Sequence, residues 1–176
     1  PSPSSTVPTK PDNASETFTS GIMTKAGFTL YNASQTPTIT IATTQSGTTS
    51  NITVNPANLA SFSWSSISTQ TAGTGFIPTV TAKDLYSNTT TKDTTGTAFG
   101  ISVSVTFTTI ATASAASNKP TYSGSDLTGT GVSATVNLSG GSFVTDSIIL
   151  YNSDESDPTI TVTRDGKTGT SGAIAI

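Results

Sequence analysis

The sequence predicts an all-β protein whose fold is an antiparallel β-sandwich of immunoglobulin-like or jelly-roll-like type. Short runs of alternating apolar and polar residues recur about every ten residues, with Gly, Asn, Pro and Asp between them. No stretch places its apolar residues at the spacing of a helix face. Ser and Thr make up 66 of the 176 residues, and β-branched Thr suits the solvent-facing positions of a strand.

The N-terminal region is predicted to be an extended tail followed by a single strand. Residues 1–13 contain four prolines and one aliphatic side chain, Val7, so they have little to bury. Residues 15–23 then alternate, and this alternation places Phe18 and Ile22 on the same face. A strand over these residues would precede the main body of the protein.

The boundary between tail and head is expected after residue 24, which gives a tail with its strand over 1–24 and a β-sandwich head domain over 25–176. The period-two pattern is clearest at residues 101–107, where Ile, Val and Phe alternate with Ser and Thr. Residues 114–130 are predicted to form a loop. Strands are predicted in the head at 25–32, 38–44, 50–54, 62–66, 75–82, 99–113, 132–138, 143–151, 159–163 and 173–176.

One segment of the sequence occurs twice. Leu-Tyr-Asn at 30–32 and Pro-Thr-Ile-Thr-Ile at 37–41 recur as Leu-Tyr-Asn at 150–152 and Pro-Thr-Ile-Thr-Val at 158–162. In each copy Asn favours a turn and Pro tolerates the first position of a strand. The two copies are either equivalent hairpins of one sandwich or a pseudo-symmetric pair lying side by side.

Composition argues against an enzyme. The chain contains no Cys and no His, so it lacks disulfides, the commonest zinc ligands and the commonest general base. Its two glutamates, Glu16 and Glu155, lie in predicted flexible stretches and do not form a catalytic pair. We therefore predict a protein with no catalytic residues, no metal and no cofactor, apart from covalent glycans.

Charge and hydropathy argue against two classes of partner, nucleic acids and membranes. Only seven Lys and Arg residues are present, they are dispersed, and the net charge is −3, so we expect no nucleic-acid partner. No apolar run approaches the ~20 residues of a membrane span, so we expect no membrane insertion. A chain that begins Pro-Ser-Pro-Ser-Ser without Met is expected to be a processed product.

Three further motifs have both a chemical and a structural interpretation. Residues 129–134 have the spacing of a dinucleotide-binding loop, but a strand is predicted where the phosphate site needs a helix. The acidic run 152–157 favours a solvated turn, with calcium binding by an unusual loop as the alternative. Tyr and Trp at strand positions favour a role in the core, with sugar stacking as the alternative.

Five Asn-X-Ser/Thr sequences are candidates for N-glycosylation. Asn13, Asn32 and Asn88 lie in the predicted tail or loops, where a bulky glycan has room. Asn51 and Asn137 lie at the edges of predicted strands and are the weaker candidates. A coat of glycans would also cover a surface that is rich in hydroxyl groups.

A Ser/Thr-rich β-protein without Cys or His, with sequons throughout and a Pro-Ser-rich tail leading into a lone strand, resembles the subunits of archaeal extracellular filaments. It is most similar to the thread filaments of thermoacidophilic archaea. The resemblance implies an extracellular glycoprotein at the cell surface, whose partners are identical subunits in a pilus or thread. Adhesion to surfaces or to other cells is compatible with it.

In that family each subunit lends its N-terminal strand to the sandwich of the next one, and the contact propagates head to tail. The resemblance therefore implies that residues 15–23 are the donor strand, with Phe18 and Ile22 as its anchors. The competing interpretation is that this strand pairs within its own subunit. The alternative function is that of a glycosylated monomeric surface adhesin or cell-wall β-domain.

A covalent link between subunits is a further expectation. In a protein without Cys, a Lys amine can instead be joined to an Asn or Asp side chain as an isopeptide bond, if an apolar pocket keeps the amine neutral. Lys25 is the expected donor because it lies at the junction between the presumed donor strand and the head. The alternative is that Lys25 is an exposed, solubilising charge.

Overall fold

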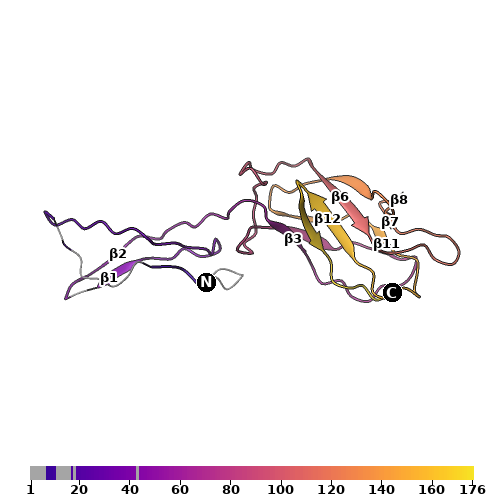
Figure 1. Ribbon diagram of the computed structural model, residues 1–176, viewed down its shortest axis with the longest axis horizontal. Coiled ribbons are helices and arrows are strands. Elements are labelled where there is room, and N and C mark those ends of the chain that lie inside the picture. Colours follow the sequence, from indigo (N-terminus) through magenta and orange to yellow (C-terminus); the bar gives the residue numbers. More distant parts are fainter. Residues whose placement is uncertain (1–6, 11–16, 18, 43) are drawn as a thin grey trace. The chain divides into compact units, whose positions relative to one another are not determined.

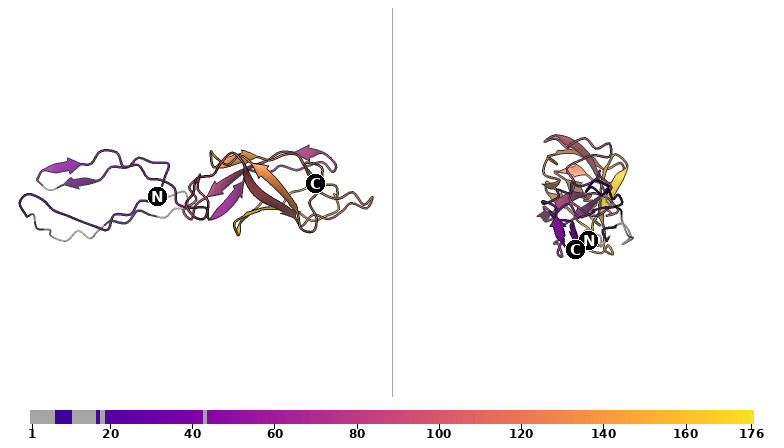
Figure 2. Two further views of the ribbon diagram at one scale, coloured as in Figure 1. Left: turned by 90° about the horizontal axis from the view of Figure 1, so that it is seen from above. Right: turned by 90° about the vertical axis from the view of Figure 1, so that its left-hand side faces the viewer.

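The computed structural model describes residues 7–10, 17, 19–42 and 44–176 (Figure 1). Every strand pairing is antiparallel and the described residues contain no helix, which confirms the all-β prediction (Figure 2). The chain divides into two units. We call them the arm, which is Pro1–Pro56 with Tyr86–Asn88, and the head, which is Ala57–Leu85 with Thr89–Ile176.

Two sheets face each other in the head. The first contains, in order of pairing, β10 (Ser142–Val144), β5 (Thr79–Lys83) and β3 (Ser61–Trp64). The second contains β13 (Lys167–Thr170), β12 (Ile160–Arg164), β6 (Val103–Thr109) and β9 (Val132–Val136). The inward side chains of both sheets form one core, as in a β-sandwich.

A third group of strands continues the first sheet around a bend. It contains β4 (Gly75–Phe76), β11 (Ile148–Ile149), β7 (Thr121–Tyr122) and β8 (Ser125–Asp126). β4 leads into β5 through residues 77–78, and β10 leads into β11 through residues 145–147. Two residues on one strand therefore oppose three on the other. This arrangement is a β-bulge. Pro78 suits the break because it has no N–H, while its carbonyl accepts the N–H of Thr145 at 2.9 Å.

Phe107 lies at the centre of the core. Its ring stacks on Tyr122 with 4.4 Å between centroids, and it makes edge contacts with Trp64 and Phe143 of the opposite sheet. The predicted alternation holds along β6, where Val103, Val105 and Phe107 are buried. Ile101 is an exception, because the strand begins only at Val103 and the Ile101 side chain is exposed.

The two sheets are joined along the edge formed by β3 and β13. The indole N–H of Trp64 donates to the carbonyl of Gly169 at 2.8 Å, which links the two strands directly. A Cβ atom at position 169 would overlap the backbone of Phe62, so only glycine allows this approach. This edge of the sandwich is therefore closed.

The predicted loop 114–130 contains an additional hairpin, which is formed by β7 and β8. Its turn has two consecutive residues with positive φ, Ser123 at 49° and Gly124 at 80°. This is the backbone of a tight two-residue hairpin turn. Sequence reasoning missed the hairpin because its two-residue strands are too short to show a period-two pattern.

The arm contains one regular hairpin, β1 (Thr40–Ala42) paired with β2 (Ser46–Thr48). The predicted single strand over 15–23 is contradicted among its described residues by a tight turn. Thr19 and Ile22 exchange two backbone hydrogen bonds, and both residues between them have positive φ. The chain therefore reverses direction here, and Thr29 pairs with Thr9 beyond the turn.

The division between the units falls after Pro56, whereas the sequence predicted it after residue 24. Residues 25–54 do include extended segments, but within the described residues the first buried hydrophobic side chain is Leu59. These segments pair among themselves and add nothing to the core of the head. The alternating pattern located the extended segments but not the core to which they belong.

The closed edge predicts the effect of a single methyl group. Gly169→Ala should lower the free energy of unfolding by about 1–3 kcal/mol, since the added Cβ must displace the backbone of β3. Gly172→Ala is the matched control, because a Cβ there would meet nothing within 4 Å. Chemical denaturation of both variants measures the difference. Equal stability of the two variants would show that this edge is not tightly closed.

Candidate functional site

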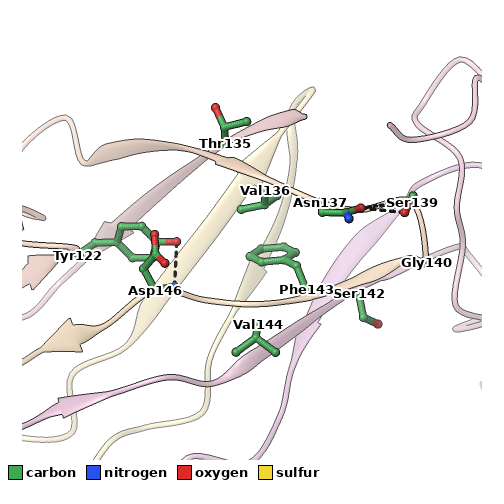
Figure 3. Close-up of a pocket in the computed structure, with 10 residues that line it drawn as sticks. All are labelled: Tyr122, Thr135, Val136, Asn137, Ser139, Gly140, Ser142, Phe143, Val144 and Asp146. Atoms are coloured by element: carbon green, nitrogen blue, oxygen red, sulfur yellow. Dashed lines mark hydrogen bonds between the residues drawn. The ribbon is translucent and has the colours of Figure 1, made fainter. Parts of the chain in front are cut away.

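The opposite edge of the sandwich is open. β9 and β10 are the outermost strands there, and in the described part of the chain each pairs with only one neighbour, β6 and β5 respectively. A cavity of about 350 Å³ lies between them, and we call it the open-edge groove (Figure 3). Its lining includes Tyr122, Val136, Asn137, Ser142, Phe143 and Asp146.

Local sequence keeps this edge open. The connection between β9 and β10 is a short turn in which the N–H and hydroxyl of Ser139 donate to the Asn137 side-chain oxygen at 3.0 and 2.7 Å (Figure 3). β7 pairs with the outer edge of β11 but ends at Tyr122, where the β7–β8 hairpin turns. Consequently nothing in the described residues pairs with the outer edge of β10.

Both apolar and polar side chains line the groove, and its exposed lining is mostly polar. Val136 and Phe143 are buried beneath it, while Val144 and the outward Ser and Thr residues of the two strands are exposed at its rim. The Tyr122 hydroxyl accepts the N–H of Asp146 at 3.2 Å, and burial raises the pKa of Tyr122. The phenol therefore stays protonated at neutral pH and is a hydrogen-bond donor.

In the described chain, the outer edges of β9 and β10 present unpaired backbone N–H and C=O groups beside the groove. No group of three or more His, Cys, Asp or Glu side chains within the described residues could hold a metal ion. An extended segment that pairs with such an edge satisfies the backbone groups and buries its own apolar side chains.

The arm has apolar side chains, but none of those in its described residues is fully buried. Ile22 is 70% exposed and Ile41 is 49% exposed, and Val7 and Phe28 are exposed as well. A second cavity, of about 660 Å³, lies within the arm and is lined by Ile22, Met23, Ile39 and Ile41. We call it the arm groove. An apolar surface of this kind is normally covered by a partner.

The predicted anchor and link residues are placed as follows. Phe18 lies outside the described residues. Ile22 directly follows the tight turn and faces the arm groove. Lys25 is half-buried in the arm, and its role in a covalent link stays a prediction.

Asn88 lies in an enclosed position, which argues against the glycan that the sequence predicts there. Its side chain is only 4% exposed, and the amide nitrogen that would carry the sugar donates to the carbonyl of Tyr31 at 2.7 Å. Its amide oxygen accepts the N–H of Ala33 at 3.0 Å. The rings of Tyr31 and Tyr86 pack beside this clamp, 4.6 Å apart. The sequence placed Asn88 in a loop correctly but could not show that the loop is enclosed.

The other sequons are more accessible. Asn137 and Asn51 are exposed, although the sequence ranked them lower, and Asn32 is half-buried. In both Asn32 and Asn137 the hydroxyl of the sequon Ser donates to the side-chain oxygen of Asn. This contact uses the amide oxygen and not the amide nitrogen, which is the atom that would carry the sugar. Asn13 lies outside the described residues.

The remaining motifs have structural roles. Residues 129–134 lead into β9, so no helix follows the glycines. The acidic run forms a turn in which Asn152 accepts the N–H of Asp154, and Glu155 accepts the N–H of Thr112. Tyr122 is buried in the core and Trp64 packs against it, as the favoured interpretation of the aromatic residues expected. Outside this core lie the half-buried Tyr31, Tyr86 and Tyr151.

Comparison with known proteins finds no matching family model, no matching curated protein and no matching solved structure. Among the described residues no helix has the length and apolar character needed to cross a membrane.

The accessibility of the sequons predicts where glycans are attached. In material purified from its natural source, peptide mass spectrometry should find sugar at Asn137 and Asn51 and none at Asn88. Asn88→Gln is the matched variant, and it should leave the glycan mass unchanged while loosening the clamp on Tyr31. A glycan on Asn88 would contradict the enclosed position of this residue.

The β7–β8 hairpin beside the open-edge groove predicts a pH dependence. The Lys119 ammonium, 2.6 Å from Asp126, and the Thr128 hydroxyl lower the pKa of Asp126 from 3.8 to about 2. A carboxyl group with a depressed pKa stabilises the folded state above pH ~4, and this contribution is lost as the pH falls through about 2.

Carbon-detected NMR titration should therefore find Asp126 protonating near pH 2. Lys119→Ala should move this pKa back toward 3.8, because the strongest hydrogen bond to the carboxylate is removed. Asp126→Asn serves as the control that removes the titration altogether. An Asp126 pKa near 3.8 in the unmodified protein would rule out the ion pair in solution.

Proposed function

We propose that this chain is a structural, non-enzymatic subunit of an extracellular filament, a pilus or thread that assembles head to tail from identical copies. The observation that carries the proposal is the open edge between β9 and β10. An unpaired sheet edge pairs readily with a strand from another chain, and natural proteins rarely leave one uncovered.

The arm offers the second surface that head-to-tail assembly needs. Its exposed apolar side chains, including Ile22 and Ile41, are not covered within the described residues. Burying a side chain of this size in a neighbour stabilises the contact by roughly 1.5–3 kcal/mol. Since arm and open edge are different surfaces of one chain, their association is heterologous and continues from copy to copy.

The donor element of this proposal is the arm rather than one strand over residues 15–23. The turn at Thr19–Ile22 prevents the described part of that segment from being continuous. Phe18 remains a proposed anchor, and Ile22 contributes through its position in the arm groove. The extracellular, cell-surface location is proposed from the accessible sequons and from the resemblance to archaeal filament subunits.

Removal of the arm tests the proposal. A chain that begins at Ala57 should remain folded, since every buried hydrophobic side chain among the described residues lies beyond this point. It should fail to form fibres, because each head would then lack a donor. Negative-stain microscopy measures fibre formation, and circular dichroism with thermal unfolding confirms the fold.

An isolated arm peptide, residues 1–56, should bind the truncated head and raise its melting temperature. Scrambled peptide of the same composition is the control. Fibres from the truncated chain would exclude the arm as donor. Discrete particles from the full chain, natively glycosylated and concentrated, would instead favour the monomeric adhesin or cell-wall domain.

A further inference from the structure

The arm and the head contain the same hairpin. We define the arm hairpin as residues 37–54 and the head hairpin as residues 158–176. Both begin with the repeated Pro-Thr-Ile-Thr segment, but they lie in different units, so they are not two hairpins of one sandwich. Their equivalence can be followed hydrogen bond by hydrogen bond.

Cross-strand contacts of the two hairpins coincide. The Thr40 and Thr48 hydroxyls lie 2.9 Å apart in the arm, as do those of Thr161 and Thr170 in the head. Three further hydrogen bonds recur. The N–H of Ile39 donates to the Thr49 hydroxyl as that of Ile160 does to the Ser171 hydroxyl, both at 3.0 Å. The carbonyl of Ile39 accepts the N–H of Thr49 at 2.9 Å and that of Ile160 accepts the N–H of Ser171 at 2.8 Å, while the carbonyls of Pro37 and Pro158 accept the N–H groups of Ile52 and Ile174 at 2.8 and 3.0 Å.

The match also includes the preceding turn. The side-chain oxygen of Asn32 accepts the N–H of Ser34 at 2.9 Å, and that of Asn152 accepts the N–H of Asp154 at 3.1 Å. Both copies therefore consist of an Asn-initiated turn followed by a Pro-started hairpin. The arm carries the same building block as the C-terminal part of the sandwich.

The two copies differ in how deeply their apolar side chains are buried. In the head hairpin Ile160, Val162 and Ile174 are 0% exposed, because the core covers their face and β6 pairs with the outer edge of β12. In the arm hairpin the counterpart Ile41 is 49% exposed. Within the described residues β1 pairs with β2 alone, so its outer edge has no counterpart of β6.

We infer that the outer edge of β1, together with the apolar face of the arm hairpin, is an interface for a second copy of this chain, whose β9 takes the place that β6 has beside β12. This inference rests on the head-to-tail association proposed above and names the surfaces involved. β9 is the matching edge because Val132 and Ala134 on its inward face are only partly buried. Ile39 and Ile41 would continue that apolar face across the contact.

The two surfaces are also electrostatically compatible. No charged residue occurs between Lys25 and Lys83, a span that contains the whole arm hairpin, and none occurs between Asp126 and Asp146, a span that contains β9. The head hairpin, in contrast, has Arg164, Asp165 and Lys167 at its exposed tip. A contact between the two uncharged surfaces therefore buries no charge, so no ion has to lose its water.

Disulfide trapping tests this pairing, because the natural chain has no Cys and any disulfide must come from the introduced residues. One chain carries Thr40→Cys, on the outward face of β1, and the other carries Ser133→Cys or Thr135→Cys, on the outward face of β9. Mixed under oxidising conditions, these full-length chains should give a disulfide-linked heterodimer. The control partner, Thr168→Cys on the exposed β13, should give none.

A second measurement uses a charge on the interface. Ile41→Asp should reduce polymer mass in sedimentation at least tenfold, because the charge would be buried against β9. Thr38→Asp adds the same charge on the opposite, exposed face of the arm hairpin and should leave assembly unchanged.

The outcomes distinguish the inference from the proposed function. Fibres that require the arm, but that give no β1–β9 heterodimer and tolerate Ile41→Asp, would overturn the inference and leave the filament proposal standing. A Thr40→Cys homodimer would place two arms together and also overturn it. An intramolecular disulfide in a chain carrying both Thr40→Cys and Thr135→Cys, without polymer, would overturn both.

Discussion

The two sheets of the head are joined along one edge only, and the rest of the structure depends on this asymmetry. Along β3 and β13 the backbones touch, because Gly169 has no side chain and the Trp64 indole bonds to its carbonyl. That contact holds Trp64 against Phe107, which in turn stacks on Tyr122. The packing is therefore complete at the edge formed by β3 and β13. The open-edge groove lies at the opposite edge of the two sheets, between β9 and β10.

The composition explains how such a molecule remains stable with few charges. Hydroxyl groups replace ions on its surface, and they bond to neighbouring backbone groups and to one another, as Thr40 does with Thr48 and Thr161 with Thr170. Such contacts do not titrate. Ten carboxylates and no His leave little stability that acid can remove. A surface of this kind fits a subunit exposed outside the cell, which is the location we propose.

Sequence reasoning located most of the strands and little of the site. The alternation in residues 103–107 predicted β6 and its buried face, because the side-chain period of a strand is a local property. The alternation failed at Ile101, which precedes the start of β6, and within residues 15–23, where a tight turn reverses the chain. The open-edge groove was not predicted: nine of its ten lining residues lie within 135–146, but whether β9 and β10 have outer partners depends on the other strands of the fold. The enclosed position of Asn88 likewise depends on residues far away in the sequence, Tyr31 and Ala33.

The repeated segment shows most clearly which features depend on local sequence and which depend on the whole fold. By itself the sequence determined that Pro-Thr-Ile-Thr at positions 37 and 158 begins the same hairpin, because turn residues and alternation act over a few neighbouring residues. Only the tertiary structure decided that Val162 is buried while its counterpart Ile41 is exposed. Burial depends on partners far away in the chain: β12 pairs with β6, some fifty residues earlier, whereas β1 pairs with β2 alone in the described residues.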